Sequence, residues 1–139
     1  MSADSNRIVF QRFVEFINTG SRDLAAELVA ADAVFHAPGM PEPLRGPEGY
    51  LRLLATLRGG FPDVRWALDE LVAEGDRLAA RFTMRGTHTG PFMGLSPSGK
   101  SFEATSMAFY RLAGGKIVEE NGLPDMMAIL RQIGATPKP

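Results

Sequence analysis

The stretch from 77 to 100, "RLAARFTMRGTHTGPFMGLSPSGK", indicates the class of the fold. In its first part apolar residues stand at every second position, namely Leu78, Ala80, Phe82 and Met84. A period of two is typical of a strand with one buried face. The second part holds proline and glycine at close spacing, as turns do. We therefore predict a strand that runs into a long hairpin loop.

The end of this stretch also matches a phosphate-binding pattern. "GLSPSGKS" (94–101) fits G-x-x-x-x-G-K-[ST]. The pattern binds phosphate where a buried strand leads into a helix whose N-terminus faces the anion. Residues 101–112 alternate as a strand does, and residues 87–93 contain a proline and a glycine. We interpret the segment as a hairpin loop and expect no nucleotide binding.

The residues on either side divide into helices and strands. Helices are predicted at about 5–17, 23–29, from Pro47 to the glycines at 59–60, and 125–133. Strands are predicted at 33–38, 64–69, 77–85, 101–112 and 116–121, with turns at 74–76 and 113–116. Helices followed by hairpin-linked strands are typical of an α+β fold with an antiparallel sheet. The helices are expected to cover the apolar face of that sheet.

The composition of the chain excludes several classes of function. The chain has 139 residues, which suggests one domain over 1–139 with a loose tail at 135–139. There is no cysteine, so thiolate chemistry and disulfides are excluded. The formal net charge is -1, and no basic face suggests nucleic acid as a partner. No apolar run approaches about 18 residues, and the N-terminus does not resemble a signal peptide. A cytoplasmic protein without a membrane partner is the expectation.

Several blocks together carry a resemblance to a known family. They are "FPDV" (61–64), "AEGDRLAARFTMRGTHTGPFMGLSPSGK" (73–100), "FYRLAGGKIVEENGLPD" (109–125) and "ILRQIG" (129–134). In this order they resemble the SnoaL-like polyketide cyclases of the nuclear transport factor 2-like superfamily. The resemblance covers about residues 7 to 134. It implies a cone, in which a strongly curved and mostly antiparallel sheet wraps around N-terminal helices and leaves a deep apolar pocket.

The resemblance also implies a function and a catalytic carboxylate. Asp125 resembles the family's general acid/base, although an aspartate before an apolar helix is equally a common N-cap. His88 is expected on the interior face, where its ring either orients substrate or bonds a nearby loop. Family members often carry an aromatic residue where this chain has Asn121, and histidine where it has Glu120. Asn121 is therefore expected to bring an amide into the pocket.

Residues on apolar faces are the candidate substrate contacts. They are Phe16, His36, Tyr50, Trp66, Phe82, Met84, Met107, Phe109 and Arg111. Pockets and cores share the same apolar lining, so each of these residues can equally be plain core. Two histidines without a neighbouring carboxylate at ligand spacing predict no metal, and no cofactor is expected.

These features predict a cofactor-independent cyclase or isomerase that acts on a hydrophobic, polyketide-like carbonyl compound. The alternatives are an epoxide hydrolase that uses Arg111, Asp125 and Glu119 with an activated water, and a non-catalytic protein that binds a small molecule. The resemblance further implies a homodimer or homotetramer that pairs through the outer face of the sheet.

Overall fold

The computed structural model describes residues 2–135, so most of the predicted loose tail lies outside the described residues. The elements in chain order are α1 (Ala3–Thr19), α2 (Arg22–Leu28), β1 (Val29–His36), β2 (Leu44–Arg45), α3 (Gly46–Gly60), β3 (Arg65–Glu74), β4 (Arg77–Thr87), β5 (Ser101–Ala113), β6 (Lys116–Pro124) and α4 (Met126–Gln132). Among the described residues, no helix combines the length and the apolar character that a membrane crossing needs.

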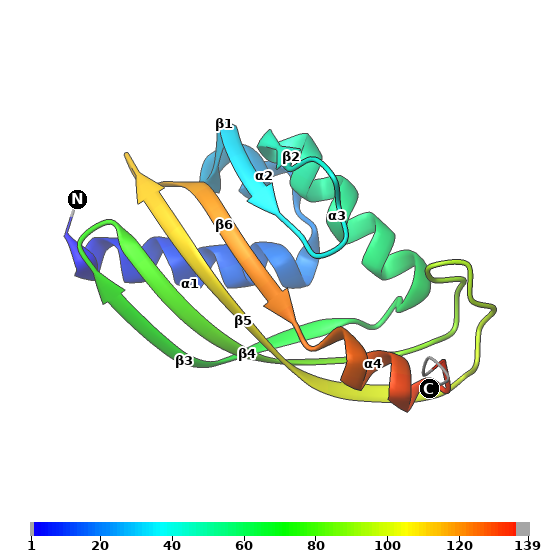
Figure 1. The fold of residues 1–139 in the computed structure, drawn as a ribbon. Coiled ribbons are helices and arrows are strands. Elements are labelled where there is room, and N and C mark those ends of the chain that lie inside the picture. The colour runs from blue at the N-terminus through cyan, green and yellow to red at the C-terminus, as the bar shows by residue number, and fades with distance from the viewer. Residues whose placement is uncertain (1, 136–139) are drawn as a thin grey trace.

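The six strands form one open, curved sheet in the order β2-β1-β6-β5-β4-β3 (Figure 1). β1 and β6 are parallel, and the other neighbouring strands are antiparallel. β2 and β3 are the two edges, so the sheet does not close into a barrel. The predicted α+β class, with N-terminal helices and a curved, mostly antiparallel sheet, is confirmed.

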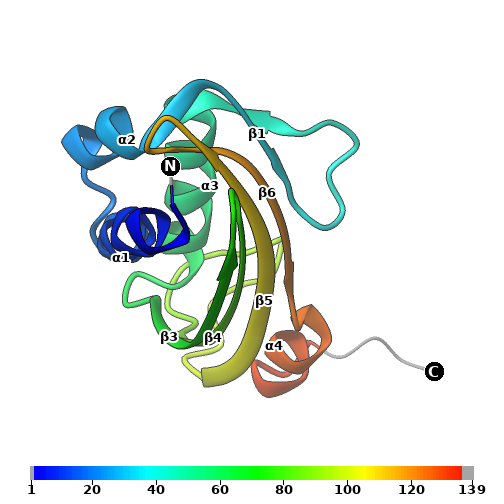
Figure 2. The same ribbon diagram turned by 90° about the vertical axis from the view of Figure 1, so that its left-hand side faces the viewer.

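The helices cover the concave face of the sheet. Figure 2 shows the sheet nearly edge-on, with α1 and α3 on its hollow side. α1 begins after Ser2, whose hydroxyl accepts a hydrogen bond from the Ser5 amide, and it ends at Gly20 in the left-handed conformation. The buried face of α1 carries aromatic and aliphatic side chains at helical spacing, namely Phe10, Phe13, Phe16 and Ile17. The sheet and the two helices therefore enclose the interior from opposite sides.

The hairpin interpretation of the loop near Lys100 is confirmed. β4 and β5 pair antiparallel up to Thr87 and Ser101. The His88 amide then donates to the Lys100 carbonyl at 2.8 Å, and the Gly99 amide donates to the His88 carbonyl at 2.8 Å. A strand and not a helix follows Lys100, so the geometry of a phosphate-binding loop is absent there.

A bulge between β5 and β6 decides which residues of β6 face the interior. Arg111 pairs with Glu119, but Leu112 pairs with Ile117, so Val118 is the extra residue. Ile117 faces inward before the bulge, and Glu120 faces inward after it. The expectation that Asn121 faces the interior is wrong, because the bulge interrupts the regular alternation that starts at Ile117 and leaves Asn121 exposed.

The expected interior positions of Met107, Phe109 and Arg111 on β5 are also wrong. Both faces of this strand carry apolar side chains, so alternation alone cannot choose between them. The concave face takes the even-numbered positions from Phe102 to Leu112, three of which are the small residues Ala104, Ser106 and Ala108. Tyr110 on this face packs against Phe10 and Phe13 of α1, whereas the small side chains of Ser106 and Ala108 leave room for a cavity.

Candidate functional site

A cavity of about 460 Å³ lies between the concave face of the sheet and α3. Its walls are mostly apolar, and α4 and the loop after β1 contribute to them through Met126, Leu130 and Met40. The polar side chains of the lining are His36, Tyr50, Thr56, Ser106, Tyr110 and Glu120. An apolar cavity with a few convergent polar groups is the usual form of a small-molecule site.

Glu120 is the one carboxylate among the described residues that line the cavity. Its side chain is only 7 % exposed, and it points inward because of the bulge at Val118. The carboxyl group lies between two tyrosines from different elements. The Tyr50 hydroxyl, on α3, donates to Glu120 Oε1 at 3.0 Å. Tyr110, the residue of β5 that pairs with Glu120, also acts on this carboxyl group through its hydroxyl and lowers its pKa.

The burial of Glu120 changes its acidity. Burial raises the pKa of its carboxyl group from 4.5 to about 7, although the two tyrosine hydroxyls act in the opposite direction. The pKa values of Tyr50 and Tyr110 are raised well above 10, first by burial and then by the neighbouring charge of Glu120. At neutral pH both tyrosines are therefore hydrogen-bond donors, and Glu120 is present in both protonation states.

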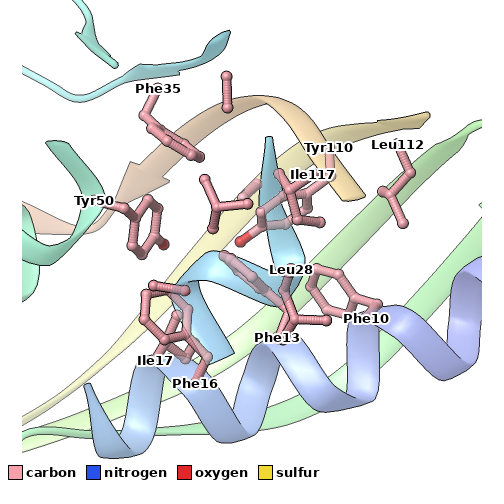
Figure 3. Packing of buried hydrophobic residues seen from close by; sticks show 14 of the residues in the cluster. Phe10, Phe13, Phe16, Ile17, Leu28, Phe35, Tyr50, Tyr110, Leu112 and Ile117 are labelled. Atoms are coloured by element: carbon pink, nitrogen blue, oxygen red, sulfur yellow. The ribbon is translucent and has the colours of Figure 1, made fainter. Parts of the chain in front are cut away.

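Aromatic packing fixes the two tyrosines. The Tyr50 ring meets Phe35 edge-on at a centroid distance of 4.5 Å, and the Tyr110 ring meets Phe10 in the same way at 4.7 Å. Phe13 contacts both tyrosine rings. Figure 3 shows these side chains in the buried cluster, with the hydroxyl oxygens of both tyrosines in red. The hydroxyl groups are thus held by rigid, buried neighbours, which is what a preorganised site requires.

Five of the residues expected to contact substrate line this cavity. They are His36, Tyr50, Trp66, Phe82 and Met84. His36 lies where β1 ends, and its Nε2 is 3.8 Å from the exposed carboxylate of Glu119. Phe16 does not line the cavity; it is fully buried and packs against Phe13 and Tyr50.

His88 is buried, as expected, but it is not part of the cavity lining. Its Nδ1 lies 3.1 Å from the Ser98 hydroxyl and accepts a hydrogen bond from the Ser98 amide. The ring also packs against Phe61 at a centroid distance of 5.5 Å. These contacts support the structural interpretation of His88, in which the ring holds the hairpin loop in place.

Asp125 lies outside the cavity. Its side chain is exposed, and Oδ1 accepts a hydrogen bond from the Ala128 amide at 3.0 Å, so it is the N-cap of α4. A solvated capping carboxylate lacks the desolvation that a base requires in this chemistry. The expected catalytic position of Asp125 is therefore not supported by the geometry.

Four further candidates lie on the convex outer face and do not reach the cavity, namely Asn121, Met107, Phe109 and Arg111. The arrangement required for epoxide hydrolysis is consequently not assembled in the cavity, because Arg111 and Asp125 are both exposed. Among residues 2–135, no three histidine or acidic side chains come together as metal ligands would.

Glu120 is the residue that the sequence does not identify as a site residue. Regular alternation from Ile117 places Glu119 and Asn121 inside and Glu120 outside. The adjacent apolar residues Ile117 and Val118 are the local sign that the alternation shifts at this point. The tyrosine partners come from sequence positions 10 and 70 residues away, so no local pattern connects them to Glu120.

Comparisons with known proteins agree with this architecture. The family model described as SnoaL-like polyketide cyclase matches residues 7–133. The chain is 30% identical over 128 residues to the aklanonic acid methyl ester cyclase AcmA of Streptomyces galilaeus, covering 89% of this chain and 87% of that protein.

Two solved structures extend the comparison. IdmH of Streptomyces antibioticus is 34% identical with a TM-score of 0.83, over 93% of this chain and 98% of IdmH. A SnoaL-like polyketide cyclase of Agrobacterium tumefaciens is 26% identical with a TM-score of 0.78, over 93% of this chain and 98% of its own.

Proposed function

The chain belongs to the SnoaL-like polyketide cyclase family, and from this premise we propose that it closes a ring in a hydrophobic, polyketide-like carbonyl compound by an intramolecular aldol reaction. Family membership supports a function of the cyclase or isomerase type. The identity of the base is the further step, and we assign it to Glu120. The observation that carries this assignment is that Glu120 is the one buried carboxylate among the described residues of the cavity lining, with the Tyr50 hydroxyl donating to it.

The proposed reaction needs one group that both takes and returns a proton. Glu120, as the carboxylate, takes a proton from the carbon next to a substrate carbonyl. The resulting enolate attacks a second carbonyl of the same molecule, which forms the new carbon–carbon bond. The protonated Glu120 then returns the proton to the alkoxide, so the product is an isomer of the substrate. A carboxyl group with a pKa of about 7 suits both steps near neutral pH.

The cavity supports a substrate that is apolar and uncharged. No lysine or arginine is among the described residues that line it, so an anionic substrate would find no counter-charge there. The related protein AcmA is named for a methyl ester, in which the charge of the acid is removed. Trp66, Phe82 and Met84 supply apolar surface that folds a flexible chain into the geometry for attack.

The proposal is tested with aklanonic acid methyl ester as the trial substrate and three proteins. Wild type, Glu120→Gln and Asp125→Asn are compared by chromatographic separation of the ester from its cyclised isomer. Glu120→Gln keeps the size of the side chain but cannot accept the proton, so kcat should fall by roughly 10²–10⁴. Asp125→Asn keeps the cap of α4 and serves as the matched control, with turnover close to that of the wild type.

The opposite result, normal turnover in Glu120→Gln and loss in Asp125→Asn, would remove Glu120 from the mechanism. A wild type that binds the ester but does not convert it would favour the non-catalytic binding protein instead.

A further inference from the structure

Gly122 occupies a special position beside the carboxyl group of Glu120. Along the inner face of β5 and β6, three cross-strand pairs follow one another, namely Tyr110 with Glu120, Ala108 with Gly122, and Ser106 with Pro124. All six residues line the cavity. The middle pair carries one methyl group in total, so the sheet is hollowed next to the carboxylate.

The backbone of Gly122 does not require glycine. Its φ angle is not in the left-handed region, in contrast to several turn glycines of the chain. A Cβ atom at this position would lie 3.5 Å from Glu120 Oε2 and 3.9 Å from the Cβ of Ala108. These are ordinary contact distances, so an alanine fits without a clash. A side chain at 122 would nevertheless occupy the space directly in front of Oε2.

Oε2 is the carboxylate oxygen next to this hollow, 3.5 Å from the position of a Cβ atom at 122, whereas Oε1 accepts the hydrogen bond from Tyr50. A proton donor must approach a base to about 3–3.5 Å before transfer. A Cβ atom at position 122 would lie 3.5 Å from Oε2, so it would occupy the place that the proton donor needs.

We propose that Gly122 is a specificity-determining residue, whose missing side chain leaves the space in which the reacting C–H group next to the substrate carbonyl contacts Glu120 Oε2. This inference rests on the proposed function, since it takes Glu120 as the base. It adds that access to the base is set at one position of β6, and that the reacting segment of the substrate is thin enough to enter between Ala108 and Glu120.

The test compares Gly122→Ala and Gly122→Val with Gly59→Ala. Gly59 lies on α3, has no positive φ and does not line the cavity, and a Cβ atom there would have no neighbour within 4 Å, so it controls for the loss of a glycine. Binding of aklanonic acid methyl ester is followed through the fluorescence of Trp66, the single tryptophan, which lines the cavity. Turnover and the melting temperature are measured on the same samples.

We expect Gly122→Ala to keep the melting temperature and to lower kcat/KM by about 10- to 200-fold, the usual effect of one misplaced methyl group in a pocket. Gly122→Val should lose more, and Gly59→Ala should match the wild type. The pH midpoint of kcat/KM should stay unchanged in Gly122→Ala, because the substrate is excluded while the base itself is intact.

Three outcomes would overturn the assignment. If Gly122→Ala binds and converts the ester as the wild type does, the hollow is not used, although Glu120→Gln can still confirm the proposed function. If the lost activity returns at higher pH, the methyl group acts on the ionisation of Glu120 and not on access. If the wild type neither binds nor converts the ester, the inference and the proposed substrate class fail together.

Discussion

At the scale of single residues, the carboxyl group of Glu120 is buried, and its ionised form is poorly solvated there. Burial raises the pKa of Glu120 to about 7, and the hydrogen bonds from Tyr110 and Tyr50 partly offset that rise. The two tyrosines therefore act as positioning residues that set how much carboxylate is present at a given pH.

This balance predicts the pH profile of the reaction. If Glu120 is the base, kcat/KM should rise with pH and level off above a midpoint near 7, because only the carboxylate accepts a proton. Tyr50→Phe removes a hydrogen bond that favours the carboxylate, so the midpoint should move to higher pH. Rates measured from pH 5 to 9 on both proteins test this, and an unchanged or lowered midpoint in Tyr50→Phe would contradict it.

The same residue predicts a pH-dependent stability. The pKa of Glu120 rises from 4.5 to about 7 on folding, so the folded protein holds this proton more tightly than the unfolded chain does. The stabilising contribution is complete below pH 4.5 and is lost as the pH rises through 7. At 1.36 kcal/mol for each pKa unit, the loss is about 3 kcal/mol.

Glu120→Gln has no proton to release at this position. Its free energy of unfolding should therefore decrease less than that of the wild type between pH 4 and pH 8, by about 3 kcal/mol. Urea titrations of both proteins at the two pH values measure the difference, and parallel pH dependences would show that Glu120 is not perturbed by burial.

At the scale of the elements, the helix α4 depends on its cap. This helix has seven residues, too few for stability without its cap and the packing of Ile129. Asp125 Oδ1 accepts from the Ala128 amide and satisfies one of the free amides of the first turn.

Replacing this cap should have a measurable and selective effect. Asp125→Ala should lower the free energy of unfolding by about 1 kcal/mol, and Asp125→Asn should change it much less, because asparagine caps about as well as aspartate. Equilibrium unfolding in urea gives both values. An equal loss in the two variants would mean that the charge of Asp125 matters and not its hydrogen bond.

At the scale of the whole molecule, the convex face of the sheet exposes apolar side chains. Val72, Met107, Phe109 and Leu123 are between 54% and 71% exposed and border one shallow groove over β3 to β6. Exposed apolar side chains gathered on one face are typical of an interaction surface. The predicted pairing of two or more chains would use this face.

We expect the wild type to scatter light as a multiple of its chain mass of 15.1 kDa. Phe109→Glu places a charge in the lining of the apolar groove and should shift the protein to the mass of one chain. A control variant on another surface, Ile8→Glu on α1, should leave the mass unchanged. A wild type that is already 15.1 kDa at micromolar concentration would contradict the prediction.

The sequence by itself determined the order of the helices and of the five longer strands, although β2 (Leu44–Arg45) was not predicted and β1 begins at Val29, where the end of a helix was predicted. Alternation at 77–85, the hairpin turn at 113–116 and the helical spacing of Phe13, Phe16 and Ile17 are local patterns, and local patterns report periodicity directly. The same reasoning identified the loop around Lys100 as a hairpin, because the strand that follows it is visible in the sequence.

Only the tertiary structure decided which faces of β5 and β6 are inside. β5 is apolar on both faces, and its even-numbered face points inward because Tyr110 packs against Phe10 and Phe13 of α1 and Phe102 packs against Phe61. The bulge at Val118 reverses the alternation of β6 and turns Glu120 inward in place of Asn121. The candidate site follows from this reversal, since Tyr50, Tyr110 and Glu120 meet only after three separate elements have packed around one cavity.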